Sequence, residues 1–181
     1  TAAAERLRAA GHTVHVPDRY EGHAAFDTYE DAMAFAHAIG YPEMLRRAEA
    51  AVAGLPSDLV FVGWSAGGAV AEHLALNRRA TRGVVLISAA AKLSWFGASA
   101  WPNRVPVQIH YATNDEFREE DELQGFMTAV RNSGAALTLH EYRLRGHLFD
   151  DPSQVDEYNE AAAEVMWTRV LDFVAGCDPN R

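Results

Sequence analysis

The sequence predicts an α/β protein with a mostly parallel sheet that is covered by helices on both faces. Two observations support this fold class. Segments with the apolar periodicity of helices alternate along the chain with short runs that are almost continuously apolar. Such runs are typical of parallel strands that are buried on both faces. The chain has 181 residues, enough for a core of ordinary size, and we expect a single domain over residues 1–181.

The first part of the chain is expected to contain more helix than strand. We expect helices at residues 2–10, 28–39 and 43–53 and a short strand at residues 13–16. Gly11 ends the first helix as a C-terminal cap, and Pro17 stops the strand. Gly40 and Pro42 separate the second helix from the third.

The remainder of the chain alternates regularly between the two kinds of element. We expect strands at residues 59–62, 83–87, 105–111 and 137–142 and helices at residues 66–77, 119–132 and 154–174. Gly134 ends the middle helix, and an aromatic-rich segment, residues 88–104, joins two of the strands. Met166, Val170 and Phe173 recur at helical spacing in the last helix.

Composition and charge narrow the range of functions. The net charge of −9 argues against nucleic acid as a partner, because phosphate binding needs a basic surface. No apolar run approaches the ~20 residues that span a bilayer, and no signal-like segment is visible. The single cysteine, Cys177, fits a reducing compartment. We therefore expect a cytoplasmic protein, a monomer or small homo-oligomer, with a small molecule as its partner.

The pentapeptide Gly63-Trp64-Ser65-Ala66-Gly67 stands between an expected strand and an expected helix. A strand, a Gly-x-Ser-x-Gly turn and a helix are the context of a nucleophile elbow. Glycines at the first and last positions let the strand and the helix approach closely around the turn. Ser65 is therefore the candidate nucleophile. The N–H of Ala66, the next residue, is the candidate for one half of an oxyanion hole.

A serine nucleophile needs a base that takes its proton. In parallel α/β folds, functional groups gather at the carboxyl ends of the strands, so an acid and a base are sought after later strands. Asp115 follows the strand at residues 105–111, and His147 follows the strand at residues 137–142. The order Ser, Asp, His along the chain is that of α/β serine hydrolases. The three residues together predict a catalytic triad.

Each member of this set also has a simpler structural interpretation. Ser65 could be an ordinary turn serine, and Asp115 could cap the following helix. Asn114 or Asp121 could compete with Asp115 for the role of the acid. Asp150 and Asp151, close after His147 in the sequence, could orient its ring instead, although residues of the same loop are less suited to reach its far side.

No pattern in the sequence indicates a metal or a cofactor. The other histidines show no metal-ligand spacing; they are His12, His15, His23, His37, His73, His110 and His140. Gly67-Gly68 lacks the following lysine of a phosphate-binding loop. The aromatic residues Trp95, Phe96 and Trp101 could line a substrate pocket or could pin their long loop onto the core.

At these residues the chain resembles the dienelactone hydrolase family of α/β-hydrolases. The likeness runs from Ala4-Glu5-Arg6-Leu7 through the elbow and Asp115 to Gly146-His147-Leu148-Phe149. The resemblance implies a Ser65–His147–Asp115 triad, hydrolysis of small esters or lactones, no cofactor and a cytoplasmic setting. Two departures are visible. Well-known members carry cysteine in place of Ser65, and dienelactone-cleaving members carry an arginine shortly after the histidine, where this chain has Asp150 and Asp151.

The resemblance also implies a further strand upstream of Thr1, in the centre of the sheet between residues 13–16 and 59–62. In this fold the loop after that strand supplies the second oxyanion donor. We therefore expect residues 1–181 to form an α/β-hydrolase domain that is incomplete at its N-terminal side.

The predicted function is acyl transfer from a small ester or lactone to Ser65 and then to water. His147 acts as the base and then as the acid, and Asp115 holds its ring. Two alternatives remain open at this point. One is a catalytically silent α/β-hydrolase scaffold that acts in binding, and the other is a thioesterase or acyltransferase.

Overall fold

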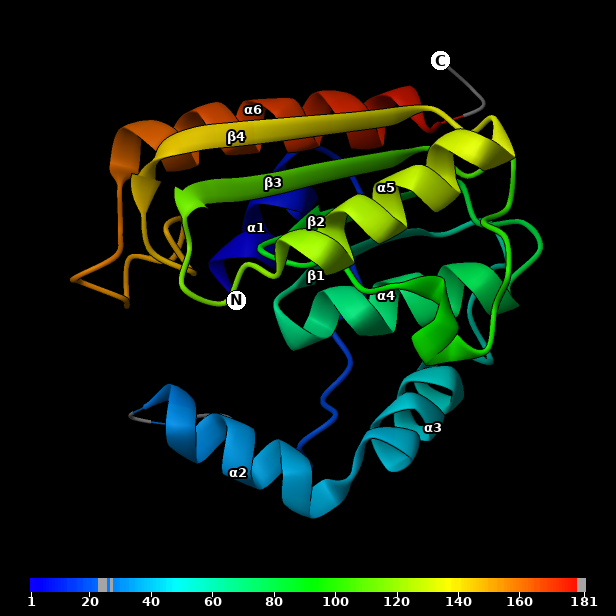
Figure 1. The fold of residues 1–181 in the computed structure, drawn as a ribbon, viewed down its shortest axis with the longest axis horizontal. Coiled ribbons are helices and arrows are strands. Elements are labelled where there is room, and N and C mark those ends of the chain that lie inside the picture. Colours follow the sequence, from blue (N-terminus) through cyan, green and yellow to red (C-terminus); the bar gives the residue numbers. More distant parts are fainter. Residues whose placement is uncertain (23–25, 27, 179–181) are drawn as a thin grey trace. The chain divides into compact units, whose positions relative to one another are not determined.

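The computed structural model describes residues 1–22, 26 and 28–178 (Figure 1). The chain forms two compact units, Thr1–Leu55 and Pro56–Arg181. The expectation of a single domain stays a prediction, and each unit is described by itself. Among the described residues, no helix combines the length and the hydropathy that crossing a bilayer requires.

The first unit contains three helices, α1 (Ala2–Ala9), α2 (Tyr29–Ile39) and α3 (Tyr41–Val52). Threonine side chains cap the first two, because Thr1 accepts a hydrogen bond from the N–H of Ala4 and Thr28 accepts one from Asp31. α3 begins two residues earlier than predicted. Pro42 lies in its first turn, where a missing N–H costs no helical hydrogen bond.

The predicted strand at residues 13–16 is wrong. A strand needs a neighbouring strand to exchange backbone hydrogen bonds with. In the part of the chain that the structure describes, the sheet includes no strand that pairs with this segment. A side chain bonds its backbone instead, since Nη2 of Arg8 donates to the carbonyl oxygen of Val14 at 3.0 Å.

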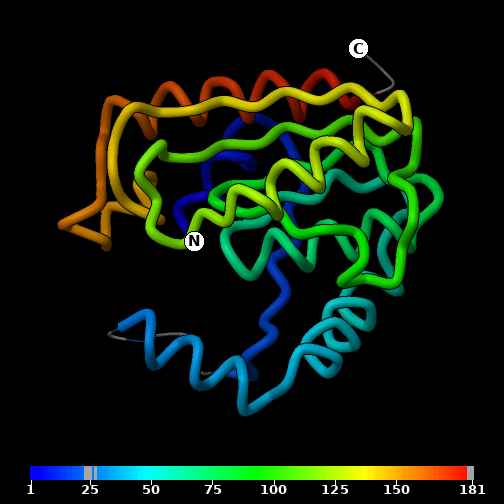
Figure 2. Tube along the Cα trace, viewed as in Figure 1, coloured from blue at the N-terminus to red at the C-terminus, as the bar shows by residue number. Residues whose placement is uncertain are grey.

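The second unit contains the sheet. Its strands are β1 (Val60–Trp64), β2 (Gly83–Ile87), β3 (Val107–Asn114) and β4 (Leu137–Arg145). Its helices are α4 (Ala66–Asn77), the 3-10 helix η1 (Leu93–Phe96), α5 (Glu120–Ser133) and α6 (Glu160–Gly176). The strands lie in the order β1-β2-β3-β4, and every neighbouring pair is parallel. The chain therefore returns to the same end of the sheet after each strand, as Figure 2 shows.

Helices cover both faces of this sheet, as the sequence predicts. A Cβ at Gly63 would collide with the backbone of Gly67 at the start of α4, so this position of β1 faces α4. The next residue, Trp64, packs its ring against Trp167 of α6, with 5.9 Å between the ring centroids. Consecutive strand residues point to opposite faces, so α4 and α6 lie on opposite faces. In Figure 1, α5 lies on the face opposite α6.

Burial on both faces explains why the sequence of the inner strand β2 is continuously apolar. Val84, Val85, Leu86 and Ile87 of β2 are completely buried. Strands that are covered on both faces have no polar side to alternate with. β3 and β4 extend three residues further than predicted, to Asn114 and Arg145.

The last helix begins at Glu160, six residues later than predicted. Asn159 precedes it and caps it, because its side chain accepts a hydrogen bond from the N–H of Ala162. The backbone N–H of Asn159 bonds to the carbonyl oxygen of Phe149 at 2.9 Å, so the segment before α6 folds back onto the loop that follows β4.

Candidate active site

Ser65 lies in a sharp turn between β1 and α4, with φ 49° and ψ −125°. Few residues other than glycine adopt a positive φ, and such strain is common at functional sites. Two backbone hydrogen bonds hold the turn. The N–H of Ser65 donates to the carbonyl of Ile87 at 3.0 Å, and the N–H of Gly68 donates to the carbonyl of Ser65 at 2.8 Å. The sequence-predicted elbow is therefore present as a strained strand–turn–helix.

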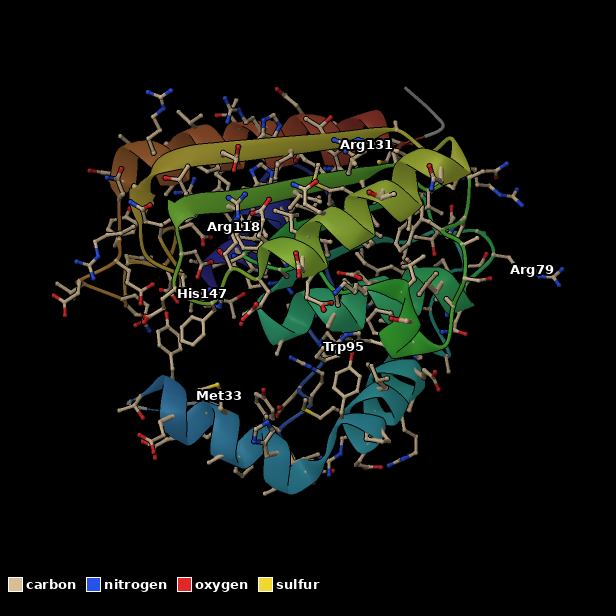
Figure 3. The ribbon with its side chains drawn as sticks, in the orientation of Figure 1. Met33, Arg79, Trp95, Arg118, Arg131 and His147 are labelled. Atoms are coloured by element: carbon tan, nitrogen blue, oxygen red, sulfur yellow. The ribbon has the colours of Figure 1, made fainter. Side chains whose placement is uncertain are left out.

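The structure brings together the three residues that the sequence singles out. Nε2 of His147 lies 2.7 Å from Oγ of Ser65, and Nδ1 lies 2.9 and 2.8 Å from the two carboxylate oxygens of Asp115. A carboxylate accepts only, so Nδ1 carries the proton that it donates to Asp115. Nε2 is then the acceptor for the Ser65 hydroxyl. Figure 3 shows His147 at the rim where β3 and β4 end.

Burial and packing hold this set in place. Asp115 and His147 are 7% and 4% exposed. The ring of Phe117 packs edge-on against the imidazole of His147, with 4.8 Å between the centroids. The N–H of Phe117 also donates to the carboxylate of Asp115 at 2.9 Å. One short loop after β3 therefore both supplies the acid and covers the ring.

The competing acids lie elsewhere. Asp150 accepts hydrogen bonds from Nε1 of Trp64, and Asp151 accepts one from the N–H of Ser153 at 2.9 Å. Asn114 is exposed at the end of β3, and Asp121 is exposed in the first turn of α5. Of the five candidates, Asp115 is the one whose carboxylate contacts the ring of His147.

Ala66 is exposed and is the first residue of α4. The first four N–H groups of a helix have no acceptor within the helix. The N–H next to Ser65 therefore belongs to the positive end of a helix dipole, where negative charge is favoured.

Arg118, three residues after Asp115, is paired with carboxylates. Its guanidinium lies 2.7 Å from Oε1 of Glu141 and 3.0 Å from Oε2 of Glu120. Its guanidinium carbon also lies over the ring of Tyr111, 5.3 Å from the centroid. Burial, followed by the negative charge of Asp115, raises the pKa of Tyr111, so this phenol stays protonated beside the acid.

The aromatic residues of the long loop divide between two environments. Trp101 is buried, donates from Nε1 to the carbonyl of Val105 at 2.8 Å and packs edge-on against Phe126 of α5. Trp95 is 65% exposed. Trp101 therefore pins the loop to the core, which was one of the two interpretations of the sequence.

The other histidines of the second unit lie outside this site. His110 of β3 is fully buried and His140 of β4 is half-buried, whereas His23 lies outside the described residues. Across the described ranges, no three His, Cys, Asp or Glu side chains converge as metal ligands do.

Two residues that the sequence did not single out contact the backbone of His147. Oγ of Ser88 donates to its carbonyl oxygen, and the carboxylate of Glu157 accepts from its N–H. Ser88 directly follows the end of β2, and this position was the only available signal. Glu157 falls within the segment predicted as helix, so nothing in the sequence marked it.

Comparisons with known proteins identify the family and the fold of the chain. The model of the dienelactone hydrolase family matches residues 1–177. No curated protein matches the chain. A solved dienelactone hydrolase-like promiscuous phosphotriesterase from metagenomic libraries is similar, with TM-score 0.69 and 16% identity over 87% of this chain and 72% of that one.

Two further solved structures share the fold. A hormone-sensitive lipase from a metagenome library has TM-score 0.58 and 13% identity over 76% of this chain and 62% of that chain. The Bacillus cereus carboxylesterase has TM-score 0.50 and 19% identity over 86% of this chain and 65% of that chain. The family match covers nearly the whole chain, and the chain belongs to the dienelactone hydrolase family.

Proposed function

We propose that this chain is a serine hydrolase that cleaves small esters or lactones through a Ser65–His147–Asp115 triad. One observation carries the proposal. The hydrogen bonds from Ser65 to His147 and from His147 to Asp115 form one continuous relay. Membership of a hydrolase family supports the reaction class.

The proposed reaction begins when Oγ of Ser65 attacks the acyl carbon of the substrate while Nε2 of His147 takes the hydroxyl proton. The carboxylate of Asp115 keeps the ring in the tautomer with the proton on Nδ1 and stabilises the imidazolium. The imidazolium then protonates the leaving alcohol or enol, which leaves an acyl-serine. His147 next takes a proton from water as the water oxygen adds to the acyl carbon. The imidazolium then returns that proton to Oγ of Ser65 as the acid is released, which restores the starting state of the triad.

The negative charge that develops on the acyl oxygen needs donors. We assign one of them to the N–H of Ala66, at the start of α4. Loss of one such donor typically lowers turnover by about 100- to 1,000-fold. The source of the second donor stays a prediction.

We infer that neutral substrates are preferred over anionic ones. The loop after His147 carries Asp150 and Asp151, and Arg118, three residues after Asp115, is paired with Glu120 and Glu141. Like charges near a bound carboxylate would weaken its binding. A cytoplasmic setting and a small-molecule partner remain part of the proposal, on the basis of the lone Cys177 and the acidic charge.

A fluorophosphonate probe tests the proposal directly, because it reacts with activated serines. We expect labelling of the wild type at Ser65 and no labelling of Ser65→Ala. Ser133→Ala is the matched control, because Ser133 is an ordinary helix-end serine whose hydroxyl donates to the carbonyl of Val130. Equal labelling of the Ser65→Ala variant and the wild type would refute the nucleophile. Labelling without turnover of nitrophenyl esters or lactones would point to another acyl acceptor, and neither labelling nor turnover would point to a binding scaffold.

A further inference from the structure

His147 lies beyond the end of β4, in a loop, whereas Ser65 and Asp115 directly follow strands. Side chains bond both sides of its backbone. Its N–H donates to Oε2 of Glu157 at 2.5 Å, and its carbonyl oxygen accepts from Oγ of Ser88 at 2.5 Å. The loop position of the base is thus fixed by one residue 59 positions before it, Ser88, and one residue ten positions after it, Glu157.

Glu157 bonds more than one point of the loop. The same carboxylate oxygen, Oε2, accepts from the N–H of Leu148 at 2.7 Å. Gly146, just before His147, has φ 111°, and a Cβ there would lie 2.8 Å from Cβ of Glu157. Only glycine adopts this backbone conformation readily, so the loop is shaped to receive the Glu157 side chain.

Ser88 is held in an unusual conformation at the end of β2, between the strands that lead to Ser65 and Asp115. It is 3% exposed and has φ 50°, in the left-handed region that non-glycine residues rarely adopt. Its N–H donates to the carbonyl of His110 at 2.8 Å. A strained conformation persists only where the surroundings impose it, and here it directs the hydroxyl to the carbonyl of His147.

We propose that Ser88 and Glu157 are positioning residues of the hydrolase, which hold the backbone of His147 so that its ring meets both Ser65 and Asp115. This inference rests on the proposed function of the same site. A displacement of about 1 Å between reacting groups can cost about 100-fold in rate. Loss of either side chain should therefore reduce kcat and leave substrate binding nearly unchanged, since neither residue contacts the substrate in the proposed mechanism.

The Glu157 variants separate the hydrogen bonds from the charge. One oxygen accepts both N–H groups, so Glu157→Gln retains an acceptor and loses only the charge. Glu157→Ala loses both. We expect kcat of Glu157→Ala to fall by about 10- to 100-fold with little change in KM, and Glu157→Gln to recover most of that loss.

The Ser88 variants separate positioning from folding. Ser88→Ala and Ser88→Gly both lack the hydroxyl, but glycine relieves the left-handed strain. We expect both variants to lose kcat alike, while Ser88→Gly retains the higher Tm. Ser133→Ala is the matched control, because it removes a hydroxyl that donates to the backbone carbonyl of Val130 on α5. Ser133 precedes the start of β4, whereas His147 follows the end of that strand.

A His147→Ala background tests whether the two residues act through the base. Residual labelling of Ser65 by the fluorophosphonate is the readout, since turnover will be very slow. If Ser88 and Glu157 act only by positioning His147, adding Ser88→Ala or Glu157→Ala should lower this residual rate no further. A general effect on folding would lower it in both backgrounds.

Three results would overturn the inference in an active wild type. The first is an unchanged kcat in both Ser88→Ala and Glu157→Ala. The second is a change in KM without a change in kcat. The third is an equal decrease of the labelling rate of Ser65 with and without His147. Failure of the proposed function is recognised separately, because the wild type would then show neither labelling of Ser65 nor turnover.

Discussion

Asp150 directs its carboxylate to the indole of Trp64, at 3.0 Å from Nε1, although it follows His147 by only three residues. The acid that contacts the ring of His147 is instead Asp115, 32 residues away in the sequence. The carboxylate that is closer to His147 in the sequence is therefore not the one that contacts its ring. The two carboxylates offer a direct test of which one serves the imidazole.

The first prediction compares Asp115→Asn with Asp150→Asn. An amide at position 115 can donate to Nδ1, which favours the wrong tautomer and removes the charge that stabilises the imidazolium. We expect kcat to fall by about 10,000-fold, as in other Ser-His-Asp enzymes. The amide oxygen of Asp150→Asn can still accept a hydrogen bond from Trp64. The kcat of this variant should stay within about threefold of the wild-type value, since the imidazolium loses no direct partner. Steady-state hydrolysis of a nitrophenyl ester gives both values, and an equal loss in the two variants would contradict the assignment.

The sequence predicts the elements of the second unit well because their patterns have local causes. α4 and β2 have the predicted bounds, since a Gly-rich turn begins one and continuous burial marks the other. The positions of Ser65, Asp115 and His147 after three strands predict that they meet in space, because the carboxyl ends of parallel strands lie at one rim of the sheet.

The errors arise where distant contacts decide the structure. Residues 13–16 have the composition of a strand but lack a pairing strand among the described residues. The helix predicted from residue 154 begins at Glu160, because the preceding segment bonds to the loop of His147. The role of Glu157 depends on this contact between residues ten apart in the sequence, which no helical or strand period indicates.

The second prediction concerns the close approach of β1 and α4. A Cβ at Gly63 would lie 2.5 Å from the carbonyl carbon of Gly67 and 2.7 Å from the N of Gly68. These are backbone atoms of a strained turn and cannot move aside easily. We expect Gly63→Ala to lower the free energy of unfolding by about 3 kcal/mol or more, at the upper end for overpacking. Gly176→Ala is the control, because among the described residues no atom beyond its own helical turn lies within 4 Å of the added Cβ. Urea denaturation measures both, and a Gly63→Ala variant as stable as the control would refute the steric argument.

Glu72 of α4 is a buried carboxyl group with one bonded oxygen. It is completely buried, and Oε1 accepts from the N–H of Ala91 at 3.0 Å. Within the described part of the chain, Oε2 has no hydrogen-bond partner. Burial, followed by the nearby charge of Glu122, raises the pKa of Glu72 well above its usual value of 4.5. The folded protein therefore keeps this carboxyl protonated under conditions in which the unfolded chain ionises it.

The third prediction follows from the sign of that shift. The stability that the protonated Glu72 contributes is present below pH 4.5 and is lost as the pH rises toward the folded-state pKa. Glu72→Gln is neutral at every pH and retains an acceptor for Ala91. The stability of the variant relative to the wild type should therefore increase by about 1.4 kcal/mol per pH unit across this window. Urea denaturation at pH 5, 6 and 7 measures the difference. A difference that is the same at all three values would mean that Glu72 is ionised in the folded protein.

A second buried polar group lies between β3, β4 and α6. Nε2 of His110 lies 2.9 Å from Oε1 of Gln108, and Nδ1 lies 2.8 Å from the hydroxyl of Tyr142. The amide oxygen accepts only, so Nε2 carries the proton and Nδ1 accepts from Tyr142. Burial, followed by the positive charges of His140 and Arg169, lowers the pKa of His110 to about 3. The imidazole of His110 is therefore buried in its neutral form.

The fourth prediction uses His110→Phe, which preserves an aromatic ring but cannot titrate. The unfolded chain binds a proton at this histidine below about pH 6.5, whereas the folded protein does so only near pH 3, so acid destabilises the wild type. At pH 7.5 the variant should be less stable by about 1–3 kcal/mol, because Gln108 and Tyr142 lose a partner. That deficit should shrink by about 1.4 kcal/mol for each pH unit below 6.5, since the variant has no histidine to protonate there. Urea denaturation between pH 7.5 and 5 provides the comparison. A stability difference between variant and wild type that stays constant over this range would mean that His110 has the same pKa in the folded and unfolded chains. That result would contradict the proposed effect of its burial.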